Sequence, residues 1–186
     1  MDKLRIFVEK IFYPLALIFI NLGVPPNIIT VIGFLTALSS SIQILFGNQF
    51  FGGILILISG FFDIMDGFVA RISGLTSKLG GFLDSVLDRF SDAFIFSSII
   101  YSGICELNIG LIVLIGSFMV SYIRCKGECL GVSLAGVGLA ERSERLIIIS
   151  LGLILNMVYI SMYLLCPLII FTIVERFYRI LKILGD

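Results

Sequence analysis

Long apolar runs separated by short polar breaks extend over almost the whole chain. The runs lie near residues 28–46, 50–69, 81–103, 107–124, 145–161 and 163–180. Most are close to the roughly 20 residues that a helix needs to cross a bilayer. Turn-forming residues fill the breaks, for example Pro25-Pro26-Asn27 and Gly47-Asn48, and a further break falls around Tyr163. The pattern predicts an all-α integral membrane fold with six transmembrane helices, preceded by an N-terminal amphipathic juxtamembrane helix around residues 3–20.

Composition agrees with this interpretation. Of 186 residues, 59% are hydrophobic and only 14% are charged, and the mean hydropathy is +1.13. A soluble domain needs a polar surface that such a chain cannot supply. We therefore expect one membrane-embedded domain over residues 1–186.

The basic residues are distributed asymmetrically. With the N-terminus in the cytoplasm and six alternating spans, all 13 Lys and Arg fall at cytoplasmic ends or loops, whereas the opposite loops carry only Glu106. This predicts a multi-pass protein of the cell membrane whose active side faces the cytoplasm. Topology alone accounts for basic residues such as Lys3, and we expect no nucleic-acid partner. Glu9 and the lack of a small-residue cleavage site argue against a cleaved signal peptide.

The four cysteines carry no metal-site signature. Cys105, Cys125, Cys129 and Cys166 form no CxxC pair, and the chain contains no histidine. We expect buried structural thiols rather than a zinc site.

Four aspartates stand within the second and third predicted spans, where a membrane protein avoids charge. Asp63 and Asp66 are three positions apart, and Asp84 and Asp88 are four apart, so each pair projects from one helical face. Two facing pairs would form a four-carboxylate cage whose mutual repulsion requires cations. Hard oxygen ligands favour Mg²⁺ or Mn²⁺, and the carboxylates suffice for two divalent ions bridging a phosphate.

Small residues and one arginine lie between the two aspartate pairs. Gly67, Ala70 and Gly80 leave room for a pyrophosphate, and Arg71 supplies a forked donor to it. The same small residues would also serve close helix packing, which is the alternative interpretation.

The complete pattern is Asp-x₂-Asp-Gly-x₂-Ala-Arg-x₈-Gly-x₃-Asp-x₃-Asp, and it resembles the motif of the CDP-alcohol phosphotransferase (CDP-alcohol phosphatidyltransferase) family. The resemblance implies that Asp63, Asp66 and Asp84, with help from Asp88, hold two divalent ions. It also implies that Asp88 takes the proton of an acceptor alcohol, which then attacks a CDP-activated lipid and displaces CMP. Asp92 lies outside the motif, and we expect it to support the ligands or the packing.

The resemblance also implies a set of residues that bind the CDP-lipid. Pro26-Asn27-Ile28-Ile29-Thr30 matches the family's cytidine-side segment, although Pro-Asn at the start of a helix would also serve as a simple cap. The implied donor-binding set is Asn27, Thr30, Asp63, Gly67, Ala70, Arg71 and Gly80. The donor would be CDP-diacylglycerol or CDP-archaeol.

A cluster of basic residues on the active side indicates the acceptor. Arg124 and Lys126 end the fourth span, and Arg142 and Arg145 begin the fifth, which suits a phosphorylated polyol. The segments around these residues resemble the inositol-phosphate branch of the family, the phosphatidylinositol-phosphate and archaetidylinositol-phosphate synthases. By that resemblance the phosphate is bound by Lys126, Arg145 and Arg179, with Arg124, Arg142 and Arg176 as alternatives.

Three alternatives remain open at this point. The basic cluster would equally form ordinary helix-end ion pairs. Glycerol-3-phosphate is the rival acceptor. A cation transporter or channel would also place aspartates in the membrane, but its acidic groups should be spread across the bilayer depth.

The family resemblance further implies a homodimer.

Overall fold

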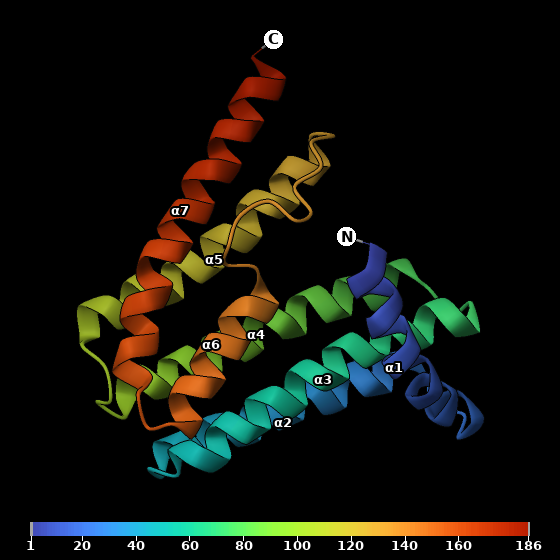
Figure 1. The fold of residues 1–186 in the computed structure, drawn as a ribbon, viewed down its shortest axis with the longest axis horizontal. Coiled ribbons are helices and arrows are strands. Elements are labelled where there is room, and N and C mark those ends of the chain that lie inside the picture. Colours follow the sequence, from blue (N-terminus) through green and yellow to red (C-terminus); the bar gives the residue numbers. More distant parts are fainter. Residues whose placement is uncertain (1, 186) are drawn as a thin grey trace.

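The computed structural model describes residues 2–185, with side chains from residue 12 onward, and this part of the chain is all-helical. It contains seven helices (Figure 1), namely α1 (Asp2–Asn21), α2 (Pro26–Leu45), α3 (Gln49–Ser73), α4 (Lys78–Tyr101), α5 (Leu107–Cys129), α6 (Arg142–Ile154) and α7 (Val158–Leu184). The predicted all-α class is confirmed.

Local sequence signals set several of these helix ends. Pro26 opens α2, where its missing N–H costs no hydrogen bond. Gly74 ends α3 in the left-handed conformation, with φ of 70°. The Ser77 hydroxyl then caps α4 by accepting from the Gly80 backbone N–H at 3.0 Å. The tight α3–α4 connection brings the two halves of the aspartate motif onto neighbouring helices.

The predicted break around Tyr163 is wrong. The chain turns instead between α6 and α7 at Asn156, a non-glycine residue with φ of 57°. Asparagine tolerates this left-handed conformation better than most residues, so it can end a helix inside an apolar run. Tyr163 and Pro167 both lie within α7.

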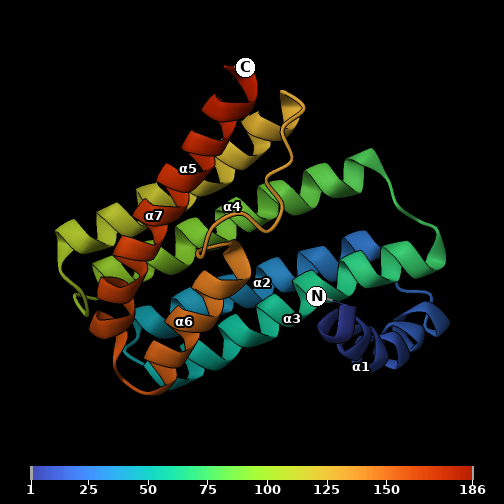
Figure 2. The same ribbon diagram turned by 45° about the horizontal axis from the view of Figure 1, so that its top comes forward.

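The helices pack into a bundle around two main apolar clusters. α2 and α3 run side by side, α4 packs on α2, α6 covers α3, and α5 pairs with α7 (Figure 2). The larger cluster draws residues from α2 to α7, including Ile56, Phe96 and Ile149. In the smaller cluster α1 lies across α3, where the Phe12 ring stacks on Phe68 with centroids 5.7 Å apart. Lys3, Arg5 and Lys10, on which the amphipathic prediction partly depends, lie outside the described side chains.

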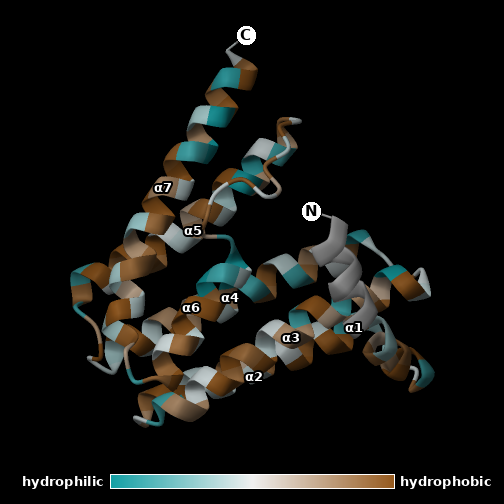
Figure 3. Ribbon diagram, viewed as in Figure 1, coloured by the Kyte–Doolittle hydropathy of each residue, from teal (hydrophilic) through white to brown (hydrophobic). Residues whose placement is uncertain are grey.

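Much of the outer surface is apolar, and several charged side chains are buried inside the bundle. Within residues 2–185, α2, α3, α5 and α7 are long and apolar enough to cross a membrane. Apolar residues cover much of these helices (Figure 3), whereas Arg145 and Arg176 are each only 1% exposed. This arrangement is that of a membrane protein. The other two predicted spans correspond to α4 and α6, which are not among these four helices. α4 carries several charges, and α6 has only 13 residues, about 20 Å.

Candidate active site

The aspartates of α3 and α4 approach one another, although these two helices pack mainly on α2 rather than on each other. Asp63, Asp84 and Asp88 each offer a carboxylate oxygen, and the three atoms lie within 4.8 Å of one another. Asp66 lies one turn beyond Asp63 on α3, is 6% exposed, and lines a pocket together with Asp84. The structure therefore brings together the residues that the motif predicts, with Asp66 beside the three-residue cluster.

The residues of this cluster fit a divalent metal. Asp66 Oδ2 and Asp84 Oδ1 are buried and have no hydrogen-bond partner among the described residues. Buried carboxylate oxygens without donors are destabilising unless a cation approaches them. The donor set is entirely oxygen, as Mg²⁺ and Mn²⁺ prefer.

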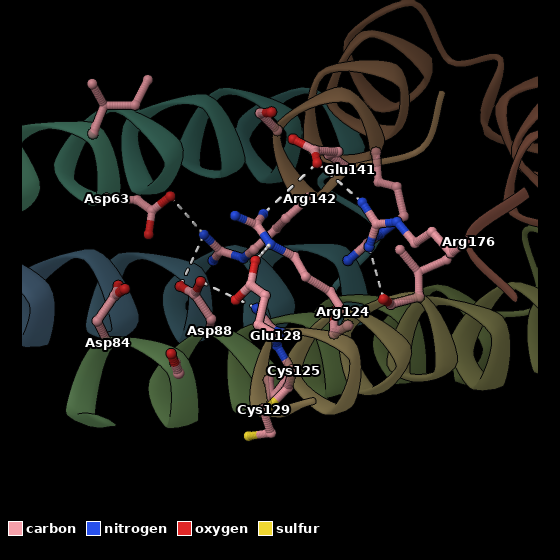
Figure 4. A pocket seen from close by; sticks show the side chains of 17 residues that line it. Asp63, Asp84, Asp88, Arg124, Cys125, Glu128, Cys129, Glu141, Arg142 and Arg176 are labelled. Carbon is pink, nitrogen blue, oxygen red and sulfur yellow. Dashed lines mark hydrogen bonds and ion pairs between the residues drawn. The ribbon is translucent and has the colours of Figure 1, made fainter. Parts of the chain in front are cut away.

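The first turn of α6 supplies a cation to this cluster. Arg142 Nη1 lies 2.8 Å from Asp63 Oδ2 and 2.9 Å from Asp88 Oδ1 (Figure 4). Arg142 Nε donates to Asp92 Oδ1 at 3.4 Å, and Arg145 Nη2 donates to Asp92 Oδ2 at 2.8 Å. Asp92 thus anchors two arginines to α4, a supporting role that its position in the sequence had suggested. The bridging position of Arg142 was missed, because it depends on contacts between distant helices.

A cavity of about 710 Å³ opens on the α5–α6 side of the aspartates. Its wall contains five arginines, and three of them have a guanidinium N–H without a hydrogen-bond partner among the described residues, at Arg89 Nε, Arg142 Nη1 and Arg145 Nε. The others are Arg124 and Arg176. Such converging, incompletely bonded guanidinium groups suit an anion.

The structure separates the six basic residues that were candidates for acceptor binding. Arg124, Arg142, Arg145 and Arg176 line the cavity, whereas Lys126 and Arg179 are not part of its wall. Both of the latter are exposed, on α5 and α7 respectively. Of the three first choices only Arg145 lines the cavity, whereas all three alternatives do.

Arg176 also holds the loop that leads into α6. Its guanidinium donates to the carbonyl oxygens of Val137 and Val120, each at 2.8 Å, and to Glu141 Oε1 at 3.0 Å. One turn earlier on α7, Thr172 Oγ1 accepts from the backbone N–H groups of Leu139 and Ala140. These bonds position Glu141 and the start of α6 beside the aspartates.

A second pocket of about 250 Å³ lies on the other side of the aspartates, between α2, α3 and the start of α4. Its wall includes the predicted donor-binding residues Asn27, Thr30, Gly67, Ala70, Arg71 and Gly80. Asp63, also predicted for the donor, faces the larger cavity instead. At Gly80 a Cβ would lie 3.0 Å from Asn27 Oδ1, so glycine permits the close approach of α4 to the start of α2.

The cysteine prediction is only partly correct. Cys105 and Cys166 are partly buried, but Cys125 and Cys129 are exposed and line the larger cavity. Both of these thiols lie near the C-terminal end of α5, which ends at Cys129.

The family profile of CDP-alcohol phosphatidyltransferases matches residues 24–178. The chain belongs to this family. It is therefore a metal-dependent enzyme of the CDP-alcohol phosphotransferase class. The matched region includes both aspartate pairs, both pockets and the basic residues of α5 and α6.

Relatives of known name and structure agree with this assignment. The chain is 40% identical to the archaetidylinositol phosphate synthase of Pyrococcus horikoshii over 98% of its own length and 97% of that protein. It is 36% identical to the phosphatidylinositol phosphate synthase of Streptomyces avermitilis, over 77% of this chain and 62% of that one. The fold is similar to the Mycobacterium tuberculosis phosphatidylinositol phosphate synthase with CDP-DAG bound, with a TM-score of 0.81, 26% identity and coverage of 92% and 94%. A second structure of that enzyme, in complex with manganese and citrate, gives a TM-score of 0.80 at 27% identity, over 91% of this chain and 88% of that one.

Proposed function

We propose that this enzyme transfers the phosphatidyl or archaetidyl group of a CDP-activated lipid to a hydroxyl of inositol phosphate and releases CMP. The observation that carries the proposal is the position of the carboxylates between two different pockets. Asp84 lines both of them, with the small pocket of motif residues on one side and the arginine-lined cavity on the other. A nucleotide-activated donor and an anionic acceptor can thus reach the same carboxylates from opposite sides.

The small pocket suits the CDP part of the donor. Small residues in its wall leave space for the donor, namely Gly67, Ala70 and Gly80. Arg71 supplies a cation for the pyrophosphate. The Arg71 guanidinium lies against Gly67, where a Cβ would be 3.2 Å from its Nη1. Asn27 and Thr30 stand at the α2 side of the pocket, within reach of the nucleoside. The pocket suits CDP-diacylglycerol and CDP-archaeol alike, since both carry the same headgroup.

Asp88 is the proposed general base. It lines the acceptor cavity and belongs to the three-carboxylate cluster, so an acceptor hydroxyl can reach it while the donor lies across the cluster. The acceptor oxygen forms a bond to the β-phosphorus as the bond from that phosphorus to the CMP oxygen breaks, and the hydroxyl proton passes to Asp88. Two divalent ions, Mg²⁺ or Mn²⁺, held by Asp63, Asp66, Asp84 and Asp88, would stabilise the negative charge of the phosphates.

Inositol phosphate is the proposed acceptor because the cavity is cationic and polar. We assign its phosphate to Arg124, Arg145 and Arg176, with Arg142 beside them, in place of Lys126 and Arg179. Relatives named for inositol phosphate products support this choice. Glycerol-3-phosphate carries the same phosphate and is the alternative acceptor. Membership of a transferase family leaves the channel hypothesis without support.

The membrane arrangement is part of the proposal. We place α2 to α7 as six membrane-crossing helices of one domain, with α1 as a juxtamembrane helix and the aspartates toward the cytoplasm of a cell membrane. Asp88 and Asp92 of α4 face Arg142 of α6 within the bundle, as intramembrane charges require. A homodimer is also expected from the family.

An acceptor panel tests the proposal directly. Purified protein in detergent is given CDP-diacylglycerol or CDP-archaeol, Mg²⁺ or Mn²⁺, and one of inositol phosphate, glycerol-3-phosphate, free inositol or serine. We expect CMP release only when donor, metal and acceptor are all present, and fastest with inositol phosphate. A better rate with free inositol or serine would show that the arginine cavity does not select a phosphate.

The role of Asp88 is tested by substitution. Asp88→Asn should lower kcat by at least about 10²-fold, because an amide cannot accept the proton. Glu128→Gln is the matched control, since Glu128 lines the same cavity but pairs with Arg124 at 2.9 Å rather than with the aspartate cluster. Near wild-type turnover of Asp88→Asn would remove the base assignment while leaving the family assignment intact.

A further inference from the structure

We propose that Arg142 competes with the divalent ions for the carboxylates of Asp63 and Asp88, so that metal binding shifts its guanidinium toward the acceptor cavity. Arg142 then becomes a positioning residue that couples metal binding to acceptor binding. This inference deepens the proposed function and rests on it.

The competition follows from shared atoms. Arg142 Nη1 is 2.8 Å from Asp63 Oδ2 and 2.9 Å from Asp88 Oδ1, so it bridges two carboxylates of the cluster. In Figure 4 the guanidinium points between these two side chains. A divalent ion held by the carboxylates of Asp63 and Asp88 would need the oxygens that Nη1 approaches, and two cations cannot occupy the same space.

The guanidinium is held by charge more than by directed hydrogen bonds. Despite the short distances, the N–H groups of Nη1 are not aligned with either carboxylate oxygen. Among the described residues, the one hydrogen bond from Arg142 is the 3.4 Å contact of Nε with Asp92. Arg145 and Arg176 differ, because their donors make aligned bonds of 2.8 Å. The end of the Arg142 side chain can therefore rotate while Nε stays near Asp92.

The larger cavity is the space into which the Arg142 guanidinium can rotate. Arg142 lines the 710 Å³ cavity together with Arg124, Arg145 and Arg176. A guanidinium displaced from Asp63 would still lie at this wall, where an acceptor phosphate needs cationic donors. The same residue can thus neutralise the carboxylates before metal binds and the phosphate afterwards.

Arg89 provides the matched control. Its Nη2 lies 3.2 Å from Asp88 Oδ2, but its side chain is 32% exposed against 12% for Arg142, and it contacts one carboxylate rather than two. Arg89→Gln removes the same charge from the same cavity without removing a bridging cation. Any general effect of lost positive charge should appear in both variants.

The test measures binding of Mn²⁺ alone to detergent-purified protein by calorimetry, together with thermal unfolding in a chelator and in saturating Mn²⁺. Arg142→Gln should tighten the Kd of Mn²⁺ about tenfold or more, whereas Arg89→Gln should change it about threefold or less. The Tm of Arg142→Gln should fall in the chelator and return to the wild-type value with Mn²⁺. Arg142→Lys keeps a competing cation and should restore the weaker Kd.

Activity supplies a second readout. In saturating Mn²⁺, Arg142→Gln should raise the KM for inositol phosphate while leaving the KM for the CDP-lipid near the wild-type value. Equal changes of Mn²⁺ affinity in the Arg142 and Arg89 variants, or an equal loss of Tm with and without Mn²⁺, would overturn the inference and leave Arg142 as a structural brace. If wild-type protein bound Mn²⁺ as described but released no CMP, the proposed function would fail while the competition stood.

Discussion

Arg176 and Arg179 lie three residues apart on α7, yet the structure gives them opposite surroundings. Arg176 is 1% exposed and donates three hydrogen bonds, which join α7 to α5, to the loop before α6 and to Glu141. Arg179 is exposed and is not part of the cavity wall. Replacing each by glutamine therefore separates a buried anchor from a surface charge on the same helix.

The structure sets the size of the expected difference. Hydrogen bonds from a charged donor contribute about 1.5–3 kcal/mol each, and removing one partner of a buried ion pair costs about 3–5 kcal/mol. Because the three bonds share one guanidinium and glutamine retains an amide donor, we expect Arg176→Gln to cost about 4 kcal/mol in total. Arg179→Gln should stay within about 0.5 kcal/mol, as exposed substitutions usually do.

Thermal unfolding in detergent measures this difference. For a chain of this size each kcal/mol lowers Tm by about 2–4 °C, so Arg176→Gln should lose about 8–16 °C and Arg179→Gln no more than about 2 °C. The KM for inositol phosphate should rise strongly in the first variant and little in the second. Equal and small shifts in both variants would refute the anchoring role, and a large KM effect from Arg179 alone would return that residue to the acceptor pocket.

Two further substitutions test other parts of the site. Gly138→Ala should lower stability by about 2–3 kcal/mol, because Gly138 has φ of 101° and a Cβ there would lie 2.3 Å from Thr172 Cγ2. A Tm close to that of the wild type would show that the loop does not depend on its contact with Thr172. Gly80→Val should raise the KM for the CDP-lipid more than the KM for the acceptor, because a Cβ would lie 3.0 Å from Asn27 Oδ1 beside the small pocket. The control in the same kinetic assay is Gly60→Val, since a Cβ at Gly60 meets nothing within 4 Å.

The acidic half of the site could be predicted from sequence because its geometry is local. Asp63 and Asp66, like Asp84 and Asp88, share a helical face by spacing alone. The α3–α4 connection is short, so the ends of the two helices stay close and these faces can approach each other. The helices themselves could also be predicted from sequence, since apolar runs and turn residues marked most of their ends.

The basic half was harder to predict because it depends on packing between distant segments. Arg142 and Asp92 are 50 residues apart in sequence, and no local pattern relates them. Whether Arg176 or Arg179 faces the inside of the bundle depends on how α7 is rotated about its own axis, and side-chain packing determines that rotation. The turn at Asn156 was missed for a similar reason, because a single polar residue in an apolar run is a weak signal compared with glycine or proline.

Burial of opposite charges explains why this helical bundle can hold its site inside an apolar surface. Asp92 lies between Arg142 and Arg145, and Glu141 lies between Arg124 and Arg176, so the charges of these two groups meet partners on other elements. Paired charges of this kind stabilise little by themselves, but an unpaired one would be costly in the same place. A charged ligand that approaches Asp63, Asp88 or Arg142 must therefore exchange with an existing ion pair. We infer that metal and phosphate binding each rearrange an arginine contact, which makes Arg142, placed between the two sets, the residue most sensitive to both.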